Sequence, residues 1–251
     1  MDLALRDETI LVTGGARRVG AAIARRLADL GARIIVHYHR GEESALALVK
    51  HLPFGGRAVG ADLAQPDGPE ELIASCIREG EEVTGLVHSA ASFVRHAPES
   101  VTVGEWDEIF ALNLRAFFFL AQHLVERRPD GLGSLVAISD AAALELPVAY
   151  LPHSVAKAAL VPLVRGLAKA MAPRYRVNGV IPGPVLAPEG TSTVEIEKMA
   201  GRTLLKRLGT PADVADAVAF LMTSSYTTGS FIEITGGSPL WRGSLMREEG
   251  S

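Results

Sequence analysis

Residues 9–20 read TILVTGGARRVG, an apolar and β-branched run followed by a glycine-rich turn. Residues 9–13 have the composition of a buried strand. From Val19 to Leu30, apolar residues recur every three or four positions, which predicts a helix that Gly31 ends. A strand, a glycine-rich turn and a helix in this order form the place where a dinucleotide pyrophosphate meets the positive end of a helix. The stretch therefore predicts the first unit of a Rossmann-type fold.

The same alternation continues to the end of the chain. Further strands are predicted at 34–37, 58–61, 86–88, 135–138, 177–181 and 231–234, and further helices at 69–78, 104–127, 152–171 and 211–222. We expect one α/β domain, doubly wound, with a mostly parallel seven-stranded sheet covered by helices on both faces.

Some local features also carry expectations. The domain core is expected at about 7–240, with a polar and disordered tail at 241–251. The irregular segment 182–201 is expected to be a binding loop. In helix 104–127, the side chains expected to face inward are Phe110, Leu114, Phe117 and Phe118.

Bulk composition narrows the class of protein. The 251 residues are 48% apolar and 22% charged, with a net charge of −4, which gives no global signal for nucleic acid or membrane. The single Cys76 cannot form an internal disulfide and has no companions for a metal site. The acidic N-terminus lacks the apolar core of a signal peptide. We therefore expect a cytoplasmic protein that acts on a small molecule.

The second predicted strand ends in the residues His37-Tyr38-His39-Arg40. Proteins that prefer NADH usually place an Asp or Glu here to bond the ribose, and this segment has none. Arg17, His39 and Arg40 instead offer cationic and donor groups, and a guanidinium matches a phosphate group well. This pattern predicts NADPH in preference to NADH.

A helix that begins near Pro152 carries a modified catalytic pattern. In a Tyr-x-x-x-Lys pair the phenol donates a proton and the lysine tunes it, but here Lys157 follows His153. Imidazole titrates near neutral pH, which suits a general acid, and Lys157 disfavours the imidazolium that Asp140 favours. The residue before a proline is disfavoured in helical conformation, so Tyr150 is expected to precede the helix and to approach the substrate. Asp140, Tyr150 and His153 all remain candidate proton donors.

Several motifs together resemble the short-chain dehydrogenase/reductase family over about residues 7–240. They are the turn 13–20, Asp62, Asn113, Lys157 and Pro182-Gly183. Other residues resemble the pteridine reductase branch: Arg18 in place of the usual turn glycine, 37–40, Ser92-Phe93, Asp140 and the segment VLAPEG at 185–190. Two departures stand out: His153 for the catalytic Tyr, and His88-Ser89-Ala90 for Asn-Asn-Ala. His88 is expected to be a packing residue with a satisfied ring.

The resemblance implies roles for particular residues. Cofactor binding would fall to Gly14, Arg17, Arg18, Val19, Gly20, His39, Arg40, Asp62, Leu63, Ser89, Ala90, Lys157, Pro182 and Gly183. Substrate would meet Arg18, Ser92, Phe93 and Tyr150. Asn113 would order a helix kink and join Asp140, Tyr150, His153 and Lys157 in catalysis. A homotetramer is implied, built on helices 104–127 and 152–171.

These implications favour an NADPH-dependent reductase of a pterin-like or dihydrofolate-like heterocycle. A carbonyl or 3-oxoacyl reductase of the same fold is the alternative, although Arg18, Asp140 and the missing Tyr speak against it. From another class, a non-catalytic NADPH-binding protein that has lost the Tyr donor would show the same pattern.

Overall fold

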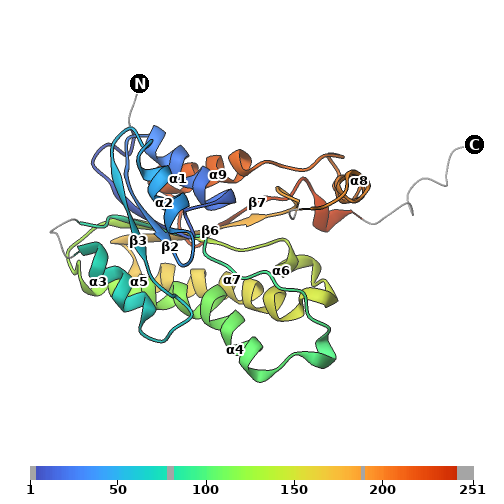
Figure 1. The fold of residues 1–251 in the computed structure, drawn as a ribbon. Coiled ribbons are helices and arrows are strands. Elements are labelled where there is room, and N and C mark those ends of the chain that lie inside the picture. The colour runs from blue at the N-terminus through green and yellow to red at the C-terminus, as the bar shows by residue number, and fades with distance from the viewer. Residues whose placement is uncertain (1–3, 78–81, 188–189, 242–251) are drawn as a thin grey trace, which may run out of the picture.

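The computed structural model describes residues 4–77, 82–187 and 190–241, and its strands form one parallel sheet (Figure 1). The strands are β1 (Thr9–Thr13), β2 (Arg33–Tyr38), β3 (Gly56–Gly60), β4 (Gly85–His88), β5 (Gly133–Ile138), β6 (Tyr175–Pro182) and β7 (Phe231–Ile234). Their order is β3-β2-β1-β4-β5-β6-β7, with Ile10 opposite Ile34 on one side and Gly85 on the other. The expected fold class is confirmed.

Helices cover both faces of this sheet, as Figure 1 shows. On one face lie α1 (Arg18–Asp29), α2 (Glu42–Val49) and α9 (Pro211–Thr223), and on the other lie α3 (Gly68–Ile77), α5 (Ala116–Glu126) and α7 (Leu151–Met171). Successive strand residues point to opposite faces, so Ile10 and Val12 join the core under α1 and α9, whereas Leu11 joins the core against α5 and α7. The strands are apolar on both faces because both faces are covered.

Three α-helices among the described residues were not expected from the sequence. Helix α2 follows Gly41, and the short α6 (Ala142–Glu145) follows β5. Helix α8 (Thr193–Gly201) occupies the second half of the segment expected to be a loop. The signal for α8 was present, because Ser192 and Glu195 form a reciprocal capping box at its start. The expectation of a loop over the whole of 182–201 is therefore wrong. The tail 242–251 and residues 188–189 lie outside the described residues.

The predicted helix 104–127 runs as α4 (Val103–Phe110), a π-helical turn (Ala111–Arg115) and α5. The buried residues of α5 are Ala116, Phe117, Leu120, Ala121 and Leu124, at three- and four-residue spacing. Phe118 lies off this stripe and is 39% exposed, so the inward placement of Phe118 is wrong. By length and composition alone the described helix could also cross a membrane, yet it packs against α3 and α7 as a core helix does.

Candidate active site

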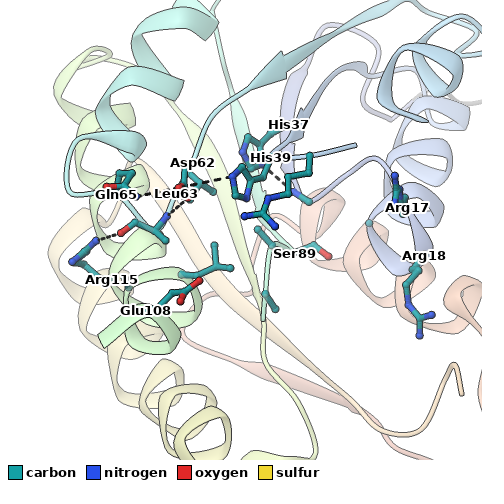
Figure 2. Close-up of a pocket in the computed structure, with 18 of the residues that line it drawn as sticks. Arg17, Arg18, His37, His39, Asp62, Leu63, Gln65, Ser89, Glu108 and Arg115 are labelled. Carbon is teal, nitrogen blue, oxygen red and sulfur yellow. Dashed lines mark hydrogen bonds and ion pairs between the residues drawn. The ribbon is translucent and has the colours of Figure 1, made fainter. Parts of the chain in front are cut away.

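A cavity of about 890 Å³ opens at the carboxyl ends of β1, β2 and β4. Figure 2 shows Arg17 and Arg18 on one side of it, at the start of α1, and Asp62, Leu63 and Gln65 on the other. It is lined by eleven of the fourteen residues expected to bind a cofactor: Gly14, Arg17, Arg18, Val19, Gly20, His39, Arg40, Asp62, Leu63, Ser89 and Ala90. The other three line an adjoining cavity.

The glycine-rich turn fits a dinucleotide because side chains have no room there. Gly14 has a φ of +62°, and a Cβ on it would lie 2.8 Å from the Cα atom of Ala90. A Cβ on Gly20 would collide with the carbonyl group of Gly14, so α1 can begin directly against the turn. No side chain caps α1 at Arg17, which leaves the first N–H groups of the helix for an anion. The turn therefore has the geometry that holds a pyrophosphate.

Arg18 departs from ordinary backbone geometry in this turn. Its φ of +51° lies in the left-handed region, where a non-glycine residue is uncommon. The side chain lines both cavities, and one guanidinium nitrogen lies 3.5 Å from the carbonyl oxygen of Ala187. An arginine at this position therefore places a cation at the junction of the two cavities.

Two buried histidines hold the turn from behind. The N–H of Gly14 donates to Nδ1 of His37 at 3.1 Å, so Nε2 of His37 carries the proton that bonds the carbonyl of Ala61. Burial lowers the pKa of His37 to about 4, which keeps the ring neutral. His37 is thus a scaffold residue that the sequence argument missed as such, because its two partners are not visible in the sequence.

His88 has a matching role on the other side of the turn. The hydroxyl of Thr13 accepts the N–H groups of Ser89 and Ala90 and donates its own proton to Nδ1 of His88 at 2.9 Å. Nε2–H of His88 then donates to the carbonyl of Leu112, in the π turn. Burial lowers the pKa of His88 to about 3. The ring is satisfied, as expected, and His88 connects β1, β4 and the π turn.

We expect His88→Asn to lessen the sensitivity of the protein to acid. The folded pKa of about 3 lies below the ordinary 6.5, so the unfolded chain binds more protons in this window and stability falls as the pH drops. Replacing His88 should reduce the loss of unfolding free energy between pH 6.5 and 4.5 by about 1–3 kcal/mol. Urea unfolding of the wild type and of His88→Asn at both pH values measures this difference in the free energy of unfolding. An unchanged pH dependence would show that His88 does not stay neutral.

A second cavity of about 600 Å³ adjoins the first and shares Arg18, Val19 and Ser89 with it. Its lining brings together seven further candidate residues: Phe93, Asp140, Tyr150, His153, Lys157, Pro182 and Gly183. Two candidates, Ser92 and Asn113, do not line either cavity. They instead form hydrogen bonds behind the lining of the second cavity, where Asn113 bonds Ser92 and Ser92 bonds His153. The carboxyl ends of β4, β5 and β6 supply most of the floor because parallel strands end at one edge.

Lys157 lies on α7 and is almost fully buried, with Nζ donating to the carbonyl of Ile138 at 2.7 Å. Burial lowers the pKa of Lys157 to about 8, against an opposing effect of the Asp140 carboxylate. An ammonium held at one fixed carbonyl presents its remaining protons to the cavity. This arrangement suits the ribose-binding role that the family resemblance implies.

His153 precedes Lys157 by one helical turn, so both side chains lie on one face of α7. The ring is 2% exposed, and Nδ1 lies 2.8 Å from the carbonyl oxygen of Ser92. Nε2 lies 3.5 Å from Oδ2 of Asp140 and forms no hydrogen bond with any described residue. Oδ1 of Asp140 accepts the N–H of Ala142 at 2.7 Å, so this carboxyl also caps a short turn.

Tyr150 immediately precedes α7, as expected, but Leu151 does not leave the helical region. Leu151 has φ −55° and ψ −46°, because a 3₁₀ turn at 148–150 leads directly into the helix; the expectation based on Pro152 is wrong for this residue. The Tyr150 ring stacks on Phe93 with centroids 4.1 Å apart and planes 10° apart. Phe93 also meets the edge of His153 at 4.8 Å. Tyr150 therefore supports Phe93 from one side.

Asn113 lies buried inside the π turn and orders it, in line with the expected kink. Its Nδ2 donates to the carbonyl of Ile109 and to both oxygens of Ser92, at 3.0–3.3 Å. Because Ser92 also accepts from His153, Asn113 supports the start of α7 through Ser92. The sequence identified Ser92 as a substrate residue; its carbonyl instead anchors the imidazole, a contact that only the tertiary structure shows.

The family model described as enoyl-(acyl carrier protein) reductase matches residues 14–238, nearly the whole of the described fold. The chain belongs to the short-chain dehydrogenase/reductase family. It is accordingly an NAD(P)-dependent oxidoreductase.

Relatives within the short-chain dehydrogenase/reductase family act on varied molecules. L-Rhamnose 1-dehydrogenase (NAD(P)(+)) of Azotobacter vinelandii is 32% identical over 248 residues, which cover 93% of this chain and 97% of that protein. FolM alternative dihydrofolate reductase 1 from Brucella canis, solved with NADP, is 28% identical with a TM-score of 0.88, covering 98% of this chain and 100% of that one. A blue fluorescent protein from a metagenomic library, solved with NADPH, is 30% identical with a TM-score of 0.87, covering 94% and 99%.

Proposed function

We propose that this oxidoreductase reduces a flat nitrogen heterocycle of the dihydropterin or dihydrofolate type with NADPH. The observation that carries the proposal is the stacking surface in the second cavity. Phe93 is 52% exposed, one of its ring faces is held by Tyr150, and Arg18 and Asp140 line the same space. A flat heterocycle can stack on an aromatic ring while charged groups bond its polar edge. Similarity to FolM alternative dihydrofolate reductase 1 supports the same substrate class.

The preference for NADPH rests on charge at the end of β2. Arg17 and Arg40 line the first cavity, and Nε of Arg17 reaches Ser44 at 3.3 Å, beside Gly41. Glu42, the nearby carboxylate, accepts the Tyr38 hydroxyl at 2.8 Å and so has a partner of its own. The guanidinium groups suit a 2′-phosphate, which carries negative charge that NADH lacks.

Arg40→Ala is expected to weaken NADPH binding about tenfold, because one charge-assisted hydrogen bond to a phosphate is lost. NADH affinity should stay within about twofold, since NADH has no 2′-phosphate. Fluorescence titration of both cofactors measures the two dissociation constants, and Arg25→Ala, an exposed arginine on α1, is the matched control. Equal weakening for both cofactors would contradict the assignment.

The residues of the second cavity have separable tasks in the proposed reaction. The nicotinamide cofactor supplies the hydride when it is bound. Lys157 orients its ribose, and Pro182 and Gly183 border the nicotinamide end of the cavity. Phe93 and Arg18 orient the heterocycle, and the group of Asp140, Tyr150 and His153 contains the proton donor. Leu186 and Met199 add apolar side chains to the lining of the same cavity.

The test is NADPH oxidation with dihydrobiopterin, dihydrofolate and a panel of small ketones under the same conditions. Turnover with a dihydropterin or dihydrofolate should exceed turnover with every ketone. Faster turnover of the ketones would instead support a carbonyl reductase. Tight NADPH binding without turnover of any of them would remove support for the heterocycle.

A further inference from the structure

The contact between His153 and Asp140 depends on which nitrogens of the imidazole ring carry a proton. Nδ1 of His153 faces the carbonyl oxygen of Ser92 at 2.8 Å, and a carbonyl only accepts hydrogen bonds, so Nδ1 carries a proton. The remaining question is whether Nε2 carries a proton as well. It is buried, it has no hydrogen-bond partner among the described residues, and it faces Oδ2 of Asp140 at 3.5 Å.

A bare Nε2 and a carboxylate oxygen both present lone pairs, and a buried acceptor such as Nε2 is unfavourably placed when it faces another acceptor. The Asp140 carboxyl cannot readily turn away, because its Oδ1 accepts the N–H of Ala142 at 2.7 Å. One proton placed between Nε2 and Oδ2 relieves the conflict, as an imidazolium beside a carboxylate or as a carboxylic acid beside an imidazole.

Access to the cavity differs between the two partners. The Asp140 side chain is 37% exposed, whereas that of His153 is 2% exposed and the Phe93 ring packs against its edge at 4.8 Å. A substrate stacked on Phe93 can reach the carboxyl of Asp140 but not Nε2. The ammonium of Lys157, on the same helix as His153, also interacts electrostatically with Asp140.

We propose that Asp140 is the catalytic acid and that His153 is a positioning residue that shares its proton. This rests on the proposed function only in requiring an acceptor that is reduced by NADPH. As the carbon of the acceptor's C=N or C=O bond gains the hydride, the π electron pair moves to the nitrogen or oxygen. That atom takes the proton from Oδ2, and the O–H electrons remain on Asp140. A proton from solvent then restores the shared proton through the exposed carboxyl.

Three single variants and one double variant separate this role from direct donation by His153. Asp140→Asn should lower kcat at least about 100-fold, the usual contribution of a general acid. His153→Gln can offer an amide N–H near the place of Nε2 and should stay within about tenfold of the wild type. His153→Asn can replace only the Nδ1 donor and should fall below His153→Gln. In the Asp140→Asn/His153→Gln double variant, turnover should be no lower than in Asp140→Asn alone, because the two residues act as one unit.

A measurement without cofactor or substrate tests the shared proton itself. In the ¹⁵N-histidine-labelled full-length protein at pH 7, the Nδ1 resonance of His153 should be that of a protonated nitrogen, and the Nε2 resonance should shift when Asp140 becomes Asn. An Nε2 resonance of a bare nitrogen that Asp140→Asn leaves unchanged would overturn the proposal. The proposal would also be overturned if His153→Gln lost as much activity as Asp140→Asn and the double variant lost the product of the two. If a ketone proves to be the better acceptor, the kcat values of the same variants are ranked on that ketone. Failure of the proposed substrate class is thereby distinguished from failure of the roles given to Asp140 and His153.

Discussion

Gly20→Ala is expected to weaken NADPH binding at least about 100-fold, which corresponds to about 2.7 kcal/mol. A Cβ at this position would meet the carbonyl oxygen of Gly14 and lie 2.9 Å from its carbonyl carbon. Both atoms belong to the backbone of the turn, so no side chain can rotate to make room. The start of α1 would have to move away from the turn, and the N–H groups aimed at the pyrophosphate would move with it.

Fluorescence titration with NADPH measures the loss, and Gly104→Ala is the matched control. Gly104 lies exposed in the first turn of α4, and a Cβ there meets nothing within 4 Å. The control should bind NADPH as the wild type does and be slightly more stable, because alanine favours helix. If Gly20→Ala bound NADPH with wild-type affinity, the turn would not be the phosphate site.

Lys157→Met should lower kcat at least about 100-fold at pH 7, because the ammonium that orients the cofactor ribose is lost. In the wild type, turnover should also fall as the pH rises through about 8, where the buried Lys157 loses its proton. The variant's residual activity should lack this step. A pH profile of kcat for the two proteins compares them directly, and a wild-type profile that stays flat to pH 9.5 would contradict the role.

The titration of Lys157 should affect stability and turnover in opposite directions: as the pH rises, turnover falls and the free energy of unfolding rises. Its folded pKa of about 8 lies below the ordinary 10.5, so between these values the unfolded chain binds more protons and the free energy of unfolding rises with pH. A shift of this size corresponds to on the order of 3 kcal/mol. Subtracting the Lys157→Met curve from the wild-type curve cancels the groups common to both. A difference that does not grow between pH 8 and 10.5 would show that Lys157 keeps its ordinary pKa.

Local patterns were sufficient for much of the fold and of the cofactor cavity. The turn 13–20, with a strand before it and a helix after it, requires only neighbours in the sequence, and its glycines lie where a Cβ cannot fit. The capping box at Ser192 was equally local and would have revealed α8. The π turn was different, because periodicity alone assumed a regular helix over 104–127. Phe118, which was expected to face inward, lies on the exposed side of α5.

The chemistry of the second cavity depended on contacts between distant segments. The sequence placed Asp140, Tyr150 and His153 near one another but left all three as donors. Their differences arise from Ser92, 61 residues before His153, which fixes the imidazole, and from Phe93, which stacks on Tyr150. Neither contact follows from spacing along the chain, because both depend on how the loop after β4 meets the start of α7.

Arg18 shows that this protein gives up some stability to keep its site. A left-handed backbone at a non-glycine residue costs on the order of 1 kcal/mol, and glycine would adopt the observed φ of +51° without that cost. Arg18→Gly would therefore relax the turn while removing the cation at the junction of the two cavities. Efforts to make the enzyme more heat-resistant would tend to select such a change, and they would remove the arginine that we propose orients the substrate.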